Sequence, residues 1–147
     1  VNCADMVVCP AMLSALQGPS VRINKDIQLH RLFEQNENSY PECMAVVHEE
    51  LGQPSVRLNF TELNSISNQL ARGIISLAGA KNSDGDFVIA VQLPPDDGLI
   101  ATLLAIWKAG AAYMPVDVAA PSHRIKHMIE EAKPCLVITI TPDGVCD

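Results

Sequence analysis

Several hallmarks of common protein classes are missing from this chain of 147 residues. Its eight glycines form neither GxGxxG nor GxxxxGK[ST], and the turn pattern at residues 82–85 precedes a strand pattern instead of a helix. The sequence therefore contains no glycine-rich phosphate-binding loop of either type. No apolar run reaches the roughly 18 residues that a membrane-spanning helix requires, so we expect no membrane partner.

Cysteine pairs at metal-binding spacing are missing as well. The five cysteines are Cys3, Cys9, Cys43, Cys135 and Cys146. None belongs to a CxxC pair and no histidine lies at zinc-finger spacing, which favours reduced thiols over a zinc site. The apolar residues 6–16 follow Asp5 and no basic stretch, which argues against a secretory signal peptide. We therefore expect a cytoplasmic protein.

Clusters of basic residues are also missing. The ten lysines and arginines are scattered, and the formal net charge is -7. Because nucleic-acid binding relies on a positive patch that follows the phosphate backbone, we expect no nucleic-acid partner. Paired acids such as Glu49 and Glu50 are more typical of a solvated surface than of a metal site.

What the sequence does contain is a regular hydrophobic pattern over most of its length. Residues 1–26 show no clear period, and we interpret them as a loosely ordered leader. The chain of 147 residues is long enough for one domain with its own core. Helical spacing begins at Leu29, and the polar residues 36–41 predict the end of that helix.

Two short strands are predicted over residues 44–48 and 56–60, and the loop between them contains Gly52. This arrangement predicts a small antiparallel hairpin. Thr61 is the predicted N-cap of a long helix, which should end near Gly79.

The next segments predict a parallel sheet. Residues 87–93 and 135–140 are almost wholly apolar, as strands covered on both faces are. Between them, Asp96 is the predicted cap of an apolar helix over residues 99–108, and Pro121 begins a further helix. Strands alternating with helices predict the α/β class, with a parallel βαβ sheet beside the small hairpin.

One pair of histidines has a spacing that can hold a metal. His123 and His127 lie four residues apart on a predicted helix, with Glu131 one turn further. The HExxH pattern is missing, however, and Arg124 and Lys126 add positive charge nearby. We therefore favour an exposed helix face over a metal site.

Lys108 and Asp117 are the other polar residues that invite a functional interpretation. Lys108 ends the apolar helix and either contacts a ligand or reaches water, where it would complement the helix dipole; we favour the second. Asp117 follows Tyr113 and Pro115, and we predict that it accepts backbone N–H bonds from the next loop. The residues alone therefore predict a domain without a reactive constellation.

Two segments resemble core motifs of a known family. Residues 107–117 (WKAGAAYMPVD) resemble the second core motif, LKAGxAYVPID, of adenylation domains in the AMP-forming ligase superfamily. Residues 58–63 (LNFTEL) resemble the first, L[TS]YxEL, and residues 68–72 (NQLAR) match the helix between them. Ala111 replaces a common glycine, and residues 118–120 depart from the usual sequence.

The resemblance covers about residues 29–140. It implies that residues 27–147 are the N-terminal portion of an AMP-binding (adenylation) domain, within the large subdomain of an adenylate-forming enzyme and truncated before the phosphate-binding loop. Such enzymes use ATP and Mg²⁺ to make an aminoacyl-adenylate, and then load phosphopantetheine on a downstream carrier domain. Agreement at residues 82–87 and 103–110 is with members that transfer β-alanine to a biogenic amine. The implied partners are small amino-acid and amine substrates.

The resemblance assigns no reactive residue to this chain. In the family, the phosphate-binding loop, the pocket and ribose aspartates and the catalytic lysine follow the second core motif, and this chain ends at Asp147 before them. Residues 58–63 and 107–117 therefore receive scaffold roles, with no catalytic, cofactor-binding or metal residue, and the chain alone should be inactive. Two alternatives stay open: an acyl- or aryl-CoA ligase of the same superfamily, and a non-catalytic α/β interaction module.

Overall fold

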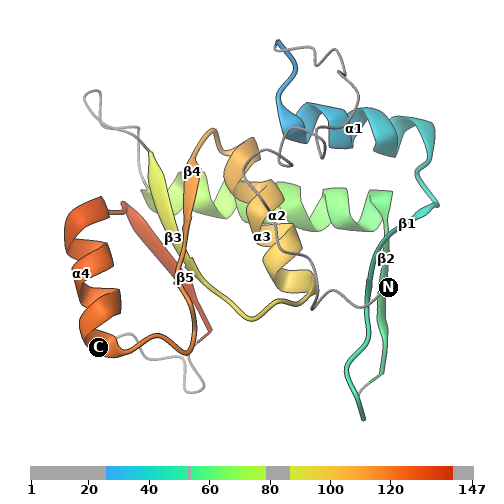
Figure 1. Cartoon of the computed structure of the whole chain (residues 1–147). Coiled ribbons are helices and arrows are strands. Elements are labelled where there is room, and N and C mark those ends of the chain that lie inside the picture. The colour runs from blue at the N-terminus through green and yellow to red at the C-terminus, as the bar shows by residue number, and fades with distance from the viewer. Residues whose placement is uncertain (1–25, 53, 79–86, 141–147) are drawn as a thin grey trace, which may run out of the picture.

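The computed structural model describes residues 26–52, 54–78 and 87–140, and these residues form a mixed α/β structure (Figure 1). The elements are α1 (Leu29–Ser39), β1 (Met44–His48), β2 (Val56–Asn59), α2 (Phe60–Ala78), β3 (Val88–Gln92), α3 (Asp97–Lys108), β4 (Ala112–Pro115), α4 (Ser122–Ala132) and β5 (Leu136–Thr139). The predicted class is confirmed. The predicted leader, apart from Asp26, lies outside the described residues, as does the predicted helix end at Gly79.

A three-stranded parallel sheet with the order β4-β3-β5 confirms the predicted βαβ pattern. The central strand β3 pairs with both neighbours, so that Ile89 faces Tyr113 on one side and Leu136 on the other. Helices α2 and α3 lie on one side of the sheet and α4 on the opposite side (Figure 1).

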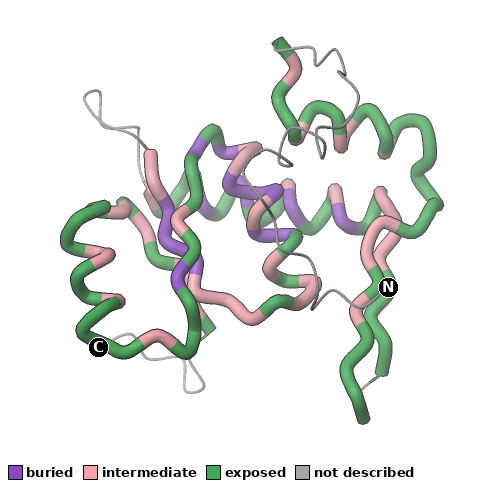
Figure 2. The backbone as a smooth tube through the Cα atoms, viewed as in Figure 1, coloured by how far each residue is buried: buried purple, intermediate pink, exposed green. Residues whose placement is uncertain are grey.

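The main hydrophobic core lies where α2 and α3 cover the sheet. Ile89 and Ile106 are completely buried there, together with Ala105, and Ile74 of α2 is 5% exposed. Figure 2 shows that the buried residues gather on β3 and on the facing sides of these two helices. A central strand that is covered in this way needs the apolar run that the sequence shows.

The predicted hairpin is confirmed, and it packs through a second apolar cluster. Strands β1 and β2 pair antiparallel, and Gly52 in the loop between them has a φ of 84°. Buried Leu63, Ala101 and Leu104 join α2 to α3, and Val46 of the hairpin packs against them. The hairpin therefore belongs to the same packed body as α2 and α3.

The predicted N-cap of α2, Thr61, is wrong by two residues. The helix begins at Phe60, and the Asn59 side-chain oxygen accepts a hydrogen bond from the Glu62 backbone N–H at 2.8 Å. In return, Glu62 Oε2 accepts one from the Asn59 backbone N–H at 2.9 Å. This reciprocal pair is a capping box. Thr61 lies inside the helix and instead donates to the Pro41 carbonyl at 3.4 Å.

Replacing Asn59 by alanine should remove the side-chain oxygen that accepts the Glu62 backbone N–H in the capping box. We expect Asn59→Ala to lower the free energy of unfolding by about 1 kcal/mol, because the Glu62 N–H loses its acceptor. Urea unfolding followed by circular dichroism measures this loss. Thr61→Ala is the matched control, and a larger loss there than at Asn59 would contradict the assignment.

Two other helix ends follow the predicted chemistry. Asp96 caps α3, since its Oδ1 accepts a hydrogen bond from the Leu99 backbone N–H at 2.9 Å. Gly110 follows α3 with a φ of 75°, a conformation that glycine adopts without steric cost. Pro121 is the residue just before α4, one position earlier than the predicted first turn.

Candidate functional site

The carboxyl ends of the parallel strands are the first place to look for a site, because open α/β sheets bind ligands there. Gln92 ends β3 and Thr139 ends β5, and the Thr139 hydroxyl donates a hydrogen bond to Gln92 Oε1 at 3.4 Å. Asp117 follows β4, and its Oδ1 accepts from the Ala119 N–H at 2.9 Å, which confirms its predicted turn role. These polar groups are engaged with the protein itself.

Lys108 lies at the centre of a polar network that sequence reasoning missed. Its Nζ donates hydrogen bonds to the side-chain oxygens of Asn64 and of Asn68, the latter at 2.8 Å. Glu34 Oε1 lies 3.9 Å from Nζ, and the Phe33 ring centroid lies 5.7 Å away. Lys108 thereby links α3 to both α2 and α1.

The prediction that Lys108 reaches water is wrong, because its side chain is only 6% exposed. Asn64 and Asn68 lie one turn apart on α2 and present both oxygens to the ammonium group. Burial lowers the pKa of Lys108 below its ordinary value of 10.5, and the negative charges of Glu34 and Glu37 partly offset this. Lys108, which belongs to the second core motif, therefore joins helices and does not face a cleft.

The histidine pair stays apart from any cluster of ligands. His123, His127 and Glu131 all lie on exposed positions of α4. In the described part of the chain, no three His, Cys, Asp or Glu side chains come together at distances that could hold a metal ion. The exposed-face interpretation agrees with these positions.

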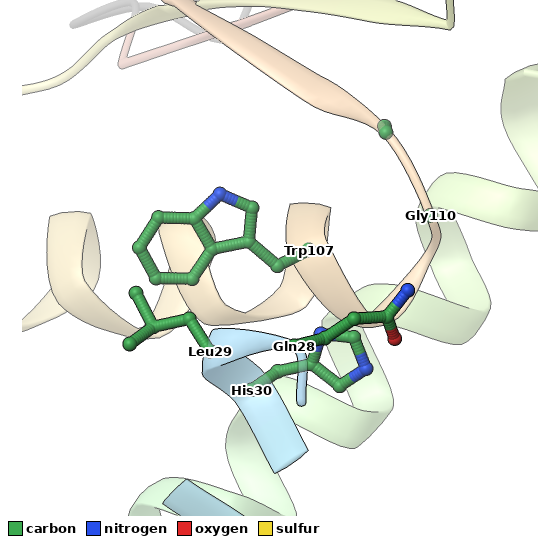
Figure 3. A pocket seen from close by; sticks show the side chains of 6 residues that line it. Gln28, Leu29, His30, Trp107 and Gly110 are labelled. Atoms are coloured by element: carbon green, nitrogen blue, oxygen red, sulfur yellow. The ribbon is translucent and has the colours of Figure 1, made fainter. Parts of the chain in front are cut away.

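A pocket of about 460 Å³ lies between the start of α1 and the end of α3 (Figure 3). Gln28, Leu29 and His30 line one side, and Trp107 and Gly110 line the other. Nothing in the sequence pattern predicted this pocket, since its two walls are about 80 residues apart in the chain. It brings part of the second core motif to the surface.

Trp107, which lines this pocket, is held in place by another aromatic residue of the same motif. The Trp107 ring meets the Tyr113 ring of β4 edge-on, with centroids 5.9 Å apart and an interplanar angle of 61°. This is a favourable aromatic geometry. The motif therefore fixes the exit of α3, the Gly110 turn and the start of β4 as one unit. This is a scaffold arrangement and contains no nucleophile paired with a base.

The two sequence motifs build an α/β scaffold. They supply its capping box, the buried Lys108 that links the helices, and the Gly110 turn. The family described as AMP-binding enzyme matches residues 33–147, and this chain belongs to that family. The predicted membership of the adenylate-forming superfamily is therefore confirmed.

Curated relatives lie among the nonribosomal peptide synthetases. The chain is 37% identical over 135 residues to the beta-alanyl-bioamine nonribosomal peptide synthetase ebony of Drosophila melanogaster, covering 82% of this chain and 15% of that protein. It is 32% identical over 111 residues to tyrocidine synthase 1 of Brevibacillus parabrevis, covering 76% of this chain and 9% of that protein. The chain thus spans only a small part of these relatives.

A solved structure shows the same fold. The N-terminal subdomain of Klebsiella oxytoca NpsA, in complex with 3-hydroxyanthranilyl-AMSN, aligns with a TM-score of 0.66 and 20% identity. The alignment covers 81% of this chain and 28% of that one. The predicted placement of these residues in the N-terminal part of an adenylation fold is therefore confirmed. None of the described helices is long and apolar enough to cross a membrane.

Proposed function

We propose that this chain forms the N-terminal part of an adenylation domain that activates an amino acid at the expense of ATP. The observation that carries the proposal is the 37% identity with the ebony synthetase over 135 residues. The full enzyme would form an aminoacyl-adenylate and then a thioester on the phosphopantetheine of a downstream carrier domain. By the same likeness, β-alanine is the proposed substrate and a biogenic amine the proposed acceptor.

The described residues fit a supporting role in that reaction and do not fit ATP or Mg²⁺ binding. ATP activation needs groups that offset charge on the phosphates, such as Mg²⁺, a phosphate-binding loop and a free lysine. No group of three carboxylates, histidines or cysteines gathers within the described ranges, and Lys108 is engaged by Asn64 and Asn68. We therefore assign no step of the reaction to these residues.

The scaffold role is specific in physical terms. The first core motif starts α2 through Asn59 and Glu62, and α2 then supplies both acceptors for Lys108. The second core motif supplies Lys108 itself and the Gly110 turn that leads into β4. The two motifs thus hold α2, α3 and the sheet in fixed relative positions.

We place the protein in the cytoplasm, since exposed Cys43 and Cys135 are free thiols.

ATP–pyrophosphate exchange tests the proposal directly. The chain of 147 residues should show no exchange with any amino acid, because its sequence contains no glycine-rich phosphate-binding loop of the GxGxxG or GxxxxGK[ST] type. A protein extended by the downstream reading frame should show exchange that depends on β-alanine. Exchange by the chain alone would contradict the scaffold role. Exchange by the extended protein with aryl or fatty acids only would favour the acyl-CoA ligase alternative, and none with any acid would favour a non-catalytic module.

A further inference from the structure

Helix α1 is held against the rest of the structure through one partly buried face. None of its residues 29–39, all of which are described, is fully buried (Figure 2). The side chain of Gln28, which precedes the helix, makes no capping hydrogen bond. Because isolated helices of fewer than about 12 residues are marginal in water, α1 depends on its contacts with α2 and α3.

The face of α1 that meets these helices combines an aromatic ring with two carboxylates. His30, Phe33, Glu34 and Glu37 are partly buried, whereas the other residues of α1 are exposed. Their spacing of three and four residues places them on one side of the helix. Since carboxylates are rarely withdrawn from water without a partner, this inward face needs a cation opposite it.

Lys108 of α3 is that cation. Its Nζ lies 3.9 Å from Glu34 Oε1 and 5.7 Å from the centroid of the Phe33 ring, and Glu37 adds a second negative charge. The Phe33 ring also contacts the Phe60 ring, with centroids 5.4 Å apart. The middle of α1 is therefore attached through one aromatic side chain and one ion pair.

Separation of this ion pair leaves neither charge without a partner. Lys108 Nζ also donates hydrogen bonds to the side-chain oxygens of Asn64 and Asn68 on α2, which do not involve α1. Glu34 Oε2 accepts a hydrogen bond from Arg31 Nη1 at 3.0 Å, and the Glu34 side chain is already 28% exposed. The main cost of breaking a buried pair, an unpaired buried charge, is therefore avoided when α1 moves away.

The turn that follows α1 is attached independently of the ion pair. The Phe60 N–H donates a hydrogen bond to the Cys43 carbonyl at 3.1 Å, and the Thr61 N–H donates one to the Pro41 carbonyl at 3.2 Å. These backbone hydrogen bonds join the turn to the start of α2 and do not depend on where α1 lies. Residues 40–43 therefore provide a fixed pivot for the helix.

We propose that α1 is a lid that detaches from α2 and α3 as one unit about residues 40–43, and that the Glu34–Lys108 ion pair holds it closed. The closed lid forms one wall of an apolar pocket of about 490 Å³, whose other walls are β1, α2 and α3. Trp107 lines this pocket as well as the one in Figure 3. The position of α1 thus determines how far both pockets open to solvent, whatever the activity of the protein.

Amide hydrogen exchange in the full chain tests whether α1 opens separately. A helix this short loses its internal hydrogen bonds once detached, so its amides should exchange together and faster than those at buried positions of α2. Low concentrations of urea should change exchange in α1 little but accelerate exchange in α2, because local opening exposes less surface than global unfolding. The same urea dependence in both helices would overturn the proposal.

Glu34→Gln tests whether the ion pair holds the lid closed. Glutamine has nearly the same shape and helix propensity as glutamate but no charge, so exchange throughout α1 should become about fivefold faster. In a Lys108→Met background the same substitution should have little further effect, since the partner is already missing. Unchanged exchange in the Glu34→Gln variant would contradict the assigned role of the pair.

Two control variants separate this ion pair from other effects of charge. Arg31→Gln removes the exposed partner of Glu34 and should change exchange in α1 by less than about twofold. Glu130→Gln makes the same chemical change in the exposed pair with Lys126 on α4 and should leave α1 as in the parent chain. An effect of either control as large as that of Glu34→Gln would show that Lys108 does not hold α1 closed.

Discussion

Replacing Ile106 by alanine is expected to lower the free energy of unfolding by about 3 kcal/mol, among the larger costs of a single core substitution. Ile106 is 0% exposed and lies in the core cluster that joins α3 to β3 and α2. The alanine variant loses the buried methyl and methylene groups and leaves a cavity among Ile89 and Ala71, which a packed sheet fills poorly.

Ile100→Ala is the matched control for Ile106→Ala, because it makes the same chemical change on the same helix at a position that is 41% exposed. Its cost should be clearly smaller, and urea unfolding followed by circular dichroism measures both variants. Equal losses at the two positions would mean that the core between α3 and the sheet is not the main source of stability.

Lys108→Met is the second substitution with a large expected effect, a loss of about 2 kcal/mol in the free energy of unfolding. Methionine retains most of the apolar stem but removes the donors that satisfy Asn64 and Asn68. Lys126→Met is the control, since its side chain is 77% exposed and its ion pair with Glu130 should contribute only a few tenths of a kcal/mol. A similar loss in both variants would contradict the structural role of Lys108.

The same two proteins, parent and Lys108→Met, should differ in their response to alkaline pH. Burial lowers the pKa of Lys108 in the folded state below 10.5, so the unfolded chain binds the proton more tightly. As pH rises from the folded pKa toward 10.5, this group therefore adds stability to the parent. The stability difference between parent and variant should widen over that range, whereas below the folded pKa it should stay constant. If the stability difference between parent and variant narrows as the pH rises, burial does not lower the pKa of Lys108.

Short sequence patterns predicted most of the secondary structure, because buried strands need apolar runs and helix starts need capping residues, and both are visible in a few consecutive residues. The apolar run at residues 87–93 predicted β3, which is covered on both faces, and the capping of α3 by Asp96 was also correct. The cap of α2 was placed two residues late because Phe60 continues the alternation of the preceding strand, although it is the first helical residue.

The interior of the candidate site could not be predicted in the same way. Lys108 contacts Asn64 and Asn68, which are 44 and 40 residues away in the chain, and no short spacing pattern records such a pair. Sequence reasoning therefore treated a lysine at a helix end as solvated. The two pockets around Trp107 likewise depend on how α1 lies against α3, which is a tertiary arrangement.

The order β4-β3-β5 has a consequence for how this chain behaves when it is isolated. Of the three strands in this sheet, the first in the sequence, β3, lies in the middle. Among residues 26–52, 54–78 and 87–140 no other strand pairs with the outer sides of β4 or β5. Each outer strand therefore offers a row of backbone donors and acceptors to any extended segment that arrives. Further strands of a longer polypeptide could dock there, but so could a neighbouring molecule in a concentrated sample. Association through these two strand edges should therefore increase with protein concentration, and the monomeric state of the protein in solution depends on keeping the edges paired or the sample dilute.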